Sequence, residues 1–196
     1  MAQSRSIVLA STSNYRRALL ARLRVEFECA APQVAESVEP GETPATAALR
    51  LAVLKARAVA PRFAGALIVG SDQVASCDGV RLGKPGHRAN AIRQLEHLSG
   101  KVAEFATAVC VLDAATGVLL SRLVPCRVTF RPLGRAQIEA YVDREQPYDC
   151  AGSAKSEGLG IALLARIETD DPTSLVGLPL IALTELLAEA GLPVLA

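Results

Sequence analysis

Continuous apolar runs alternate along this chain with segments whose apolar residues recur at helical spacing. The short apolar runs 7–10 and 66–70 are typical of buried strands. Residues 44–60 place their apolar side chains on one side of a helix, and Thr43 before Pro44 is a favourable helix start. The first third of the chain therefore predicts strands connected by an amphipathic helix.

The remainder of the chain continues this alternation but includes a long hairpin. Two strand-like segments, 102–112 and 118–130, flank a turn at 113–117. A further strand is predicted at 27–31, and further helices are predicted at 18–23, 88–98, 135–144 and 180–189. Helices alternating with strands, interrupted by one hairpin, indicate an α/β fold with a mixed sheet and flanking helices.

The loop after the first strand combines hydroxyl groups with two arginines. Arg16 and Arg17 fall in the first turn of the following helix, where the helix dipole disfavours each cation by about 0.3–1 kcal/mol. Backbone N–H groups of a helix N-terminus, hydroxyls such as that of Ser11, and guanidinium groups together form a strong anion site. The alternative interpretation is a solvated basic helix end.

Asp72 follows the apolar run 66–70, at its predicted exit. In α/β sheets, ligands bind beyond the carboxyl ends of the strands, so a carboxylate at this place is a candidate functional group. It could be a metal ligand, a general base or a cap for a neighbouring loop, and the local sequence leaves these three open.

The tripeptide Gly83-Lys84-Pro85 suggests a P-loop, but its surroundings argue against one. The spacing from Gly79 to Gly83 is one residue short of the Walker pattern, and Pro85 replaces the hydroxyl that binds the metal. Lys84 is therefore a candidate phosphate contact as a point charge, outside any P-loop.

Acidic residues suggest where a metal ion could bind. Glu36, Glu39 and Glu42 line one loop, and one of them together with Asp72 could form an oxygen site for Mg²⁺ or Mn²⁺. The alternative is that they face solvent. Zinc is not indicated, because the chain has only two histidines and no typical ligand spacing. A second acidic run, 168–171, is interpreted as a loop before a proline.

Composition and charge limit the kinds of binding partner and the cellular compartment that we expect for this protein. A chain of 196 residues fits one domain or two closely joined lobes. Its formal net charge of +1 argues against nucleic-acid or membrane partners bound through bulk charge. The five cysteines include no C-x-x-C pair, which fits a reducing, cytoplasmic location. A homodimer is left open.

Six segments in the same order resemble the Maf family of nucleoside-triphosphate pyrophosphatases. The resemblance runs from about residue 7 to residue 190 of the chain. The segments are LASTSNYRRALL, AALRLAVLKARA, VGSDQVA, LGKP, YDCAGSAKSEGLG and LVGLPLIALTELL. The resemblance implies a single Maf-like nucleotide pyrophosphatase domain over residues 1–196. It also implies an ITPase-like fold with two lobes around a central nucleotide-binding cleft.

The resemblance also implies an activity, the hydrolysis of a nucleotide to its monophosphate and diphosphate with a divalent metal, Mg²⁺ or Mn²⁺. Carried over by motif, the metal would be held by Glu36 and Asp72, and Asp72 would also be the proton acceptor. The family often has an acidic residue immediately before the position of Glu36, where this chain has Ala35. The triphosphate would be bound by Ser11, Arg16, Arg17, Lys55 and Lys84.

Three positions resemble the subgroup that prefers 7-methyl-GTP, namely Tyr15, Gln73 and Glu157. An aromatic face at Tyr15 attracts the cationic ring of 7-methylguanine, worth roughly 0.5–2 kcal/mol. The carboxylate of Glu157 suits the N–H donors of guanine. The alternatives are a dTTP/UTP or broad-specificity pyrophosphatase of the same family, or a non-catalytic regulator of septum formation.

Overall fold

The computed structural model describes residues 5–195 of the chain. Its strands form a seven-stranded mixed sheet in the order β2-β1-β3-β5-β6-β7, with β4 paired to β3. Strand β1 (Ile7–Leu9) runs parallel to both β2 (Phe27–Cys29) and β3 (Leu67–Cys77), and Leu9 lies opposite Val69. The predicted α/β fold with a mixed sheet and flanking helices is confirmed.

The described chain divides into two compact units, and each is considered by itself. Unit 1 holds residues 5–73, 107–124 and 171–195, and unit 2 holds residues 74–106 and 125–170. The prediction of a single domain over residues 1–196 stays a prediction, as does the central cleft. None of the helices in the described part of the chain is long and apolar enough to cross a membrane.

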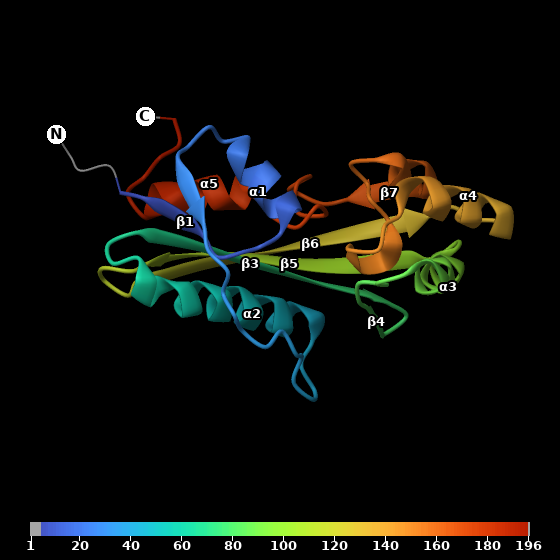
Figure 1. The fold of residues 1–196 in the computed structure, drawn as a ribbon, viewed down its shortest axis with the longest axis horizontal. Helices are drawn as coiled ribbons and strands as arrows, with labels where there is room; N and C mark the ends of the chain where they lie inside the picture. Colours follow the sequence, from blue (N-terminus) through green and yellow to red (C-terminus); the bar gives the residue numbers. More distant parts are fainter. Residues whose placement is uncertain (1–4, 196) are drawn as a thin grey trace. The chain divides into compact units, whose positions relative to one another are not determined.

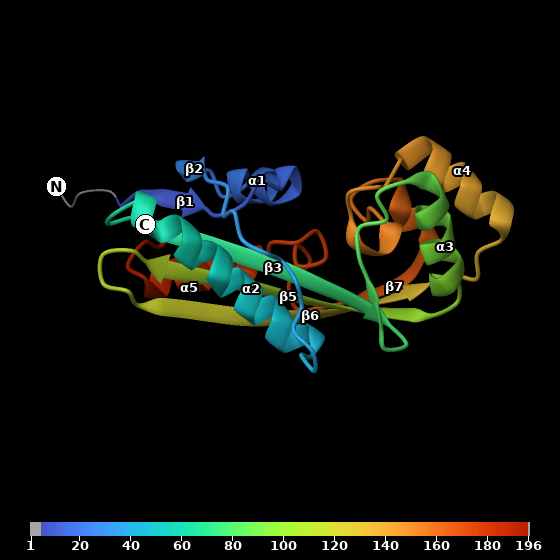
Figure 2. The ribbon, with the colours of Figure 1, turned by 60° about the horizontal axis from the view of Figure 1, so that its bottom comes forward.

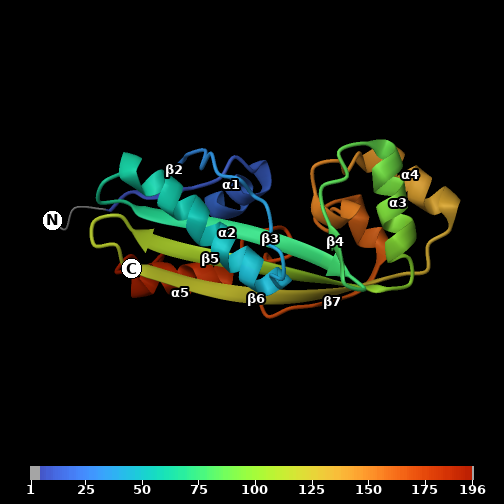
Figure 3. The same ribbon diagram turned by 90° about the horizontal axis from the view of Figure 1, so that it is seen from below.

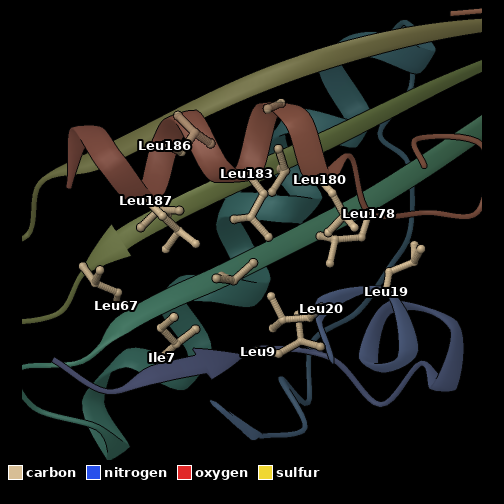
Figure 4. Close-up of a cluster of buried hydrophobic side chains, with 14 of the residues drawn as sticks. Ile7, Leu9, Leu19, Leu20, Leu67, Leu178, Leu180, Leu183, Leu186 and Leu187 are labelled. Atoms are coloured by element: carbon tan, nitrogen blue, oxygen red, sulfur yellow. The ribbon is translucent and has the colours of Figure 1, made fainter. Parts of the chain in front are cut away.

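In unit 1, helices cover both faces of the sheet. Helices α1 (Asn14–Ala21) and α5 (Leu180–Glu189) lie on one face, and α2 (Pro44–Val59) lies on the other (Figure 1). Leucines of α1 and α5 pack on the odd-numbered residues of β1 and β3 to form the core in Figure 4. Burial of these apolar side chains is the main stabilising contribution in this unit.

The opposite face of the sheet approaches α2 at a glycine. A Cβ placed on Gly70 would lie 2.2 Å from the carbonyl oxygen of Ala52 and 3.0 Å from the Cβ of Ala56. The absence of a side chain at Gly70 therefore sets how close α2 lies to β3.

In unit 2, the two helices α3 (Arg88–Leu98) and α4 (Arg135–Glu145) pack against each other, as Figures 2 and 3 show. Strands β5 (Val102–Asp113) and β6 (Leu119–Phe130) extend into this unit from the predicted hairpin. The short strands β4 (Val80–Leu82) and β7 (Leu164–Glu168) pair antiparallel with β3 and β6. The 3-10 turns are Ala60–Arg62 in unit 1, and Ala151–Ser153 and Leu159–Leu163 in unit 2.

Besides shifts of one or two residues at other ends, the elements α1, β3 and β7 differ from the prediction. Helix α1 begins at Asn14 rather than residue 18, because the Ser13 hydroxyl accepts the Arg16 N–H and caps the helix there. Arg16 and Arg17 lie in its first turn, as predicted. Strand β3 continues to Cys77 instead of ending at residue 70. Glu168, interpreted as part of a loop, is the last residue of β7.

Asp171 is also part of the acidic run that the sequence predicts to be a loop. In the structure it is buried, and its side chain caps α5 and accepts hydrogen bonds from the segment before that helix. Its Oδ2 accepts the N–H groups of Ile181 at 2.7 Å and Ala182 at 3.2 Å. Its Oδ1 accepts the backbone N–H and the hydroxyl of Thr173. One carboxylate thus fixes both the N-terminus of α5 and the loop that leads to it.

We predict that Asp171→Ala lowers the free energy of unfolding by about 2 kcal/mol, because one buried and three partly buried donors lose their acceptor. Urea denaturation measures the change. Asp149→Ala removes a carboxylate with a 61% exposed side chain and is the matched control, expected to change stability by less than about 0.5 kcal/mol. Equal stability of Asp171→Ala and the parent protein would contradict this role.

Candidate active site

A buried ion pair lies at the centre of the candidate site in unit 1. Lys55 of α2 donates to Asp72 Oδ1 of β3 at 2.6 Å, and the two residues are only 3% and 6% exposed. Asp72 is therefore inside a strand, not at a strand exit as predicted, and its charge is compensated by an ammonium group. An uncompensated carboxylate in such a buried place would be strongly destabilising.

Glu36 joins this pair from the loop before α2. Its Oε2 lies 2.9 Å from Lys55 Nζ, and its side chain is 56% exposed. A single ammonium group contacts both carboxylates, so the Glu36 and Asp72 oxygens lie within reach of one cation. The structure thus brings together Lys55, Glu36 and Asp72, which the sequence could connect only through the family resemblance. Glu42 instead pairs with Arg50, and Glu39 Oε1 lies 3.8 Å from the same Arg50 Nε.

Arg16 adds a second positive charge near the two carboxylates. Burial lowers the pKa of Arg16, while the charges of Asp72 and Glu36 act in the opposite direction. Its Nε donates to the carbonyl of Gly177 at 2.8 Å, which fixes the guanidinium group. Arg17 is exposed, which fits the alternative interpretation of a solvated helix end for this residue alone.

The other residues predicted to bind substrate are distributed over both units. In unit 1, Ser11 is buried and accepts the N–H of Ser13 at 3.1 Å, while Tyr15 is half-buried in the first turn of α1. In unit 2, Lys84 is exposed in the loop between β4 and α3, and Glu157 is exposed in the turn between the 3-10 turns Ala151–Ser153 and Leu159–Leu163. The roles of these four residues stay predictions.

Consecutive residues of β3 point their side chains to opposite faces of the sheet. Asp72 meets Lys55 of α2 on one face. On the other face, the Ser71 hydroxyl lies 2.8 Å from the Ala108 carbonyl and 3.0 Å from the Gly177 carbonyl, and Gln73 contacts Thr107. Sequence reasoning missed Thr107 and Asp171. The spacing Asp-x-Thr indicates only the local turn in which Asp171 accepts the Thr173 N–H, not the contact with α5.

Two groups of side chains are candidate metal ligands. The carboxylates of Glu36 and Asp72 are hard oxygen donors, which is the type that Mg²⁺ and Mn²⁺ prefer. A separate group in unit 2 consists of Cys77, Asp78 and His97, with ligand atoms that lie within 4.8 Å of one another. No ligand spacing in the sequence indicated this group, and the Lys101 ammonium already lies 2.9 Å from Asp78 Oδ2.

The cysteines of the core are not arranged for nucleophilic chemistry. Burial raises the pKa of the Cys110 thiol to about 12 and that of the Cys126 thiol to about 11. Both thiols are therefore protonated near neutral pH, and they pack as small apolar side chains. The reactive groups of the candidate site are its carboxylates and its cations.

The fold and this site define an α/β protein with a buried lysine–carboxylate pair between helix α2 and the central sheet. The family model described as "Maf-like protein" matches residues 6–190. The chain belongs to the Maf family, as its resemblance to that family predicted.

Curated relatives match almost the whole chain. A "7-methyl-GTP pyrophosphatase" of Albidiferax ferrireducens is 56% identical over 191 residues, covering 97% of this chain and 96% of the relative. A protein of the same name from Thiobacillus denitrificans is 56% identical over 192 residues, covering 98% and 96%.

Among solved structures, a HAM1 protein from Coxiella burnetii is similar. Its TM-score is 0.45 at 20% identity, over 64% of this chain and 73% of that one.

Proposed function

We propose that this protein is a nucleoside-triphosphate pyrophosphatase that hydrolyses 7-methyl-GTP to 7-methyl-GMP and diphosphate. The observation that carries the chemistry is the buried Lys55–Asp72 pair beside Glu36 and Arg16. The substrate is proposed from relatives of that name that are 56% identical to this chain. The residues Tyr15, Gln73 and Glu157 support the same substrate.

In this proposal Asp72 accepts a proton from the water that attacks the substrate. Among the described residues, Lys55 alone hydrogen-bonds the Asp72 side chain, and it does so at Oδ1. Oδ2 therefore keeps its lone pairs for a proton from water. The water oxygen forms a bond to the α-phosphorus, the phosphoanhydride between the α- and β-phosphates breaks, and diphosphate leaves with the bridging oxygen and its electron pair.

Cationic side chains compensate the charge of the triphosphate. Arg16 and Lys55 lie beside the carboxylates, and we include Ser11, Arg17 and Lys84 among the proposed phosphate contacts. Guanidinium groups bind phosphate oxygens through paired N–H donors, and ammonium groups act as point charges. Such groups favour the transition state by stabilising the charge that develops on the leaving diphosphate.

A divalent cation completes the proposal, with Glu36 and Asp72 as the residues that would hold it. Mg²⁺ binds proteins through one or two carboxylates and takes the rest of its ligands from water and phosphate, which fits this donor set. When bound, the metal would withdraw charge from the phosphate oxygens. We further propose a cytoplasmic location, since the five cysteines are free thiols.

The purified protein should be assayed with Mg²⁺ or Mn²⁺ against 7-methyl-GTP, GTP, dTTP and UTP, with diphosphate and orthophosphate measured separately. We expect diphosphate with no orthophosphate, the highest kcat/KM for 7-methyl-GTP, and loss of turnover when EDTA removes the metal. A higher kcat/KM for dTTP or UTP would overturn the proposed substrate. Absence of turnover with every nucleotide would overturn the enzyme itself and favour a non-catalytic role.

A further inference from the structure

The side chain of Gln73 is held by three oxygen atoms of unit 1. Its Nε2 lies 2.9 Å from Thr107 Oγ1, 2.9 Å from the Ser174 carbonyl and 3.1 Å from the Leu175 carbonyl. The two carbonyls belong to the loop between Asp171 and α5, and Thr107 lies in β5. Gln73 is itself half-buried, so part of its side chain contacts solvent.

These partners fix which end of the Gln73 amide faces them. Backbone carbonyl oxygens have no hydrogen to donate, so the atom that they contact must be the amide nitrogen rather than Oε1. The orientation of a glutamine amide is often ambiguous, but here the chemistry of the neighbours decides it. Oε1 consequently points away from the loop, and that end of the amide can only accept hydrogen bonds.

Thr107 connects the Gln73 amide to the loop before α5. It is fully buried, and its hydroxyl donates to the Ser174 carbonyl at 3.0 Å. Because its single hydrogen is used there, the hydroxyl oxygen must accept from Gln73. Thr107 thus holds the Gln73 amide and the Ser174 carbonyl in one hydrogen-bonded network.

We infer that Thr107 is a positioning residue for base selectivity, which locks Gln73 so that Oε1 accepts an N–H donor of the substrate base. This inference rests on the proposed function, in which Gln73 is a selectivity residue. Guanine offers adjacent N1–H and N2–H donors, whereas thymine and uracil offer a single N3–H donor flanked by the acceptors O2 and O4. A glutamine locked as an acceptor therefore favours a guanine-type base over a pyrimidine.

The test measures kcat/KM for 7-methyl-GTP and for UTP in Thr107→Val, which retains the shape but loses the hydroxyl. We expect the ratio of the two values to fall about tenfold, through a higher KM for 7-methyl-GTP, because one ordered hydrogen bond is lost. Thr107→Ser restores the hydroxyl and should recover most of the ratio. Thr129→Val makes the same exchange in β6, outside this network, and should leave both values unchanged.

A double-mutant cycle separates positioning from a general structural effect. Gln73→Met removes the amide, and adding Thr107→Val to it should then change the ratio no further. If Thr107→Val leaves the ratio unchanged while the parent protein prefers 7-methyl-GTP, the inference fails and the proposed function stands. If the parent protein hydrolyses no nucleotide, the proposed function itself fails. An equal effect of Thr107→Val with and without Gln73 would also overturn the inference.

Discussion

Replacing Asp72 by asparagine should lower kcat by about 10²–10⁴-fold, which is the usual contribution of a positioned general base. Asparagine has nearly the same shape, and its Oδ1 can still accept the Lys55 hydrogen bond that the structure shows at 2.6 Å. The amide, however, cannot take a proton from water near neutral pH. Release of diphosphate from 7-methyl-GTP measures the loss.

The choice of substitution matters because Asp72 also supports the fold. Asp72→Ala would leave the buried Lys55 with the half-exposed Glu36 as its remaining carboxylate, and breaking a buried pair costs about 3–5 kcal/mol. Asp143→Asn is a matched control, since it removes a carboxylate that pairs with Arg88 on exposed helix surfaces. It should retain parental activity. A folded Asp72→Asn protein with parental kcat would exclude Asp72 as the base.

Gly70→Ala should lower the free energy of unfolding by more than about 3 kcal/mol, above the usual cost of overpacking. The added methyl group would lie 2.2 Å from the Ala52 carbonyl and 2.9 Å from Cys110 Sγ, so α2 would have to move away from β3. Because Lys55 lies on α2, that movement should also lengthen its contact with Asp72 and reduce activity. Urea denaturation and the diphosphate assay measure the two effects.

Gly134→Ala provides the control for this prediction. A Cβ at Gly134 would meet Gln137 Oε1 at 3.6 Å, which is an ordinary contact. We expect its stability to remain within about 1 kcal/mol of the parent protein, the range of a weakened helix N-cap. If Gly70→Ala were as stable as Gly134→Ala, the close approach of α2 to β3 would be contradicted.

Those elements that rest on local signals could be predicted from the sequence. Helix α2 begins at Pro44 with Thr43 as its cap, as Thr-Pro before an amphipathic pattern predicts. Helices α3 and α5 have the predicted bounds 88–98 and 180–189. Each of these helices is specified by apolar periodicity over its own length, without reference to distant residues.

Strand β3 shows why the rest could not be predicted. Ser71 and Asp72 look like the polar end of a buried strand, yet the strand continues to Cys77 because both side chains find partners inside the protein. Those partners, Gly177 and Lys55, are 106 and 17 residues away in the sequence. A local pattern cannot distinguish a polar residue that will be satisfied at such a distance from one that ends a strand.

Prediction of the candidate site from the sequence is limited in the same way, because some of its residues acquire their roles through distant partners. Local signals could indicate Arg16, because a cation in the first turn of a helix opposes the helix dipole, and Asp72, because a carboxylate follows a buried apolar run. They could not indicate Thr107, since threonine is common in strands and its hydroxyl acquires a role only through Gln73 and Ser174. The family resemblance supplied Lys55 and Gln73, which no local rule would have selected.

The alternation along β3 has a consequence for changing this protein by design. Asp72 is supported from the α2 side, and Gln73 is supported from the side of Thr107 and the loop before α5. Substitutions in that loop can therefore be directed at the choice of base without touching Lys55, provided that they spare Gly177, which holds Arg16. On β3, the carboxylate proposed for catalysis and the amide proposed for base selection are therefore adjacent residues held by different partners.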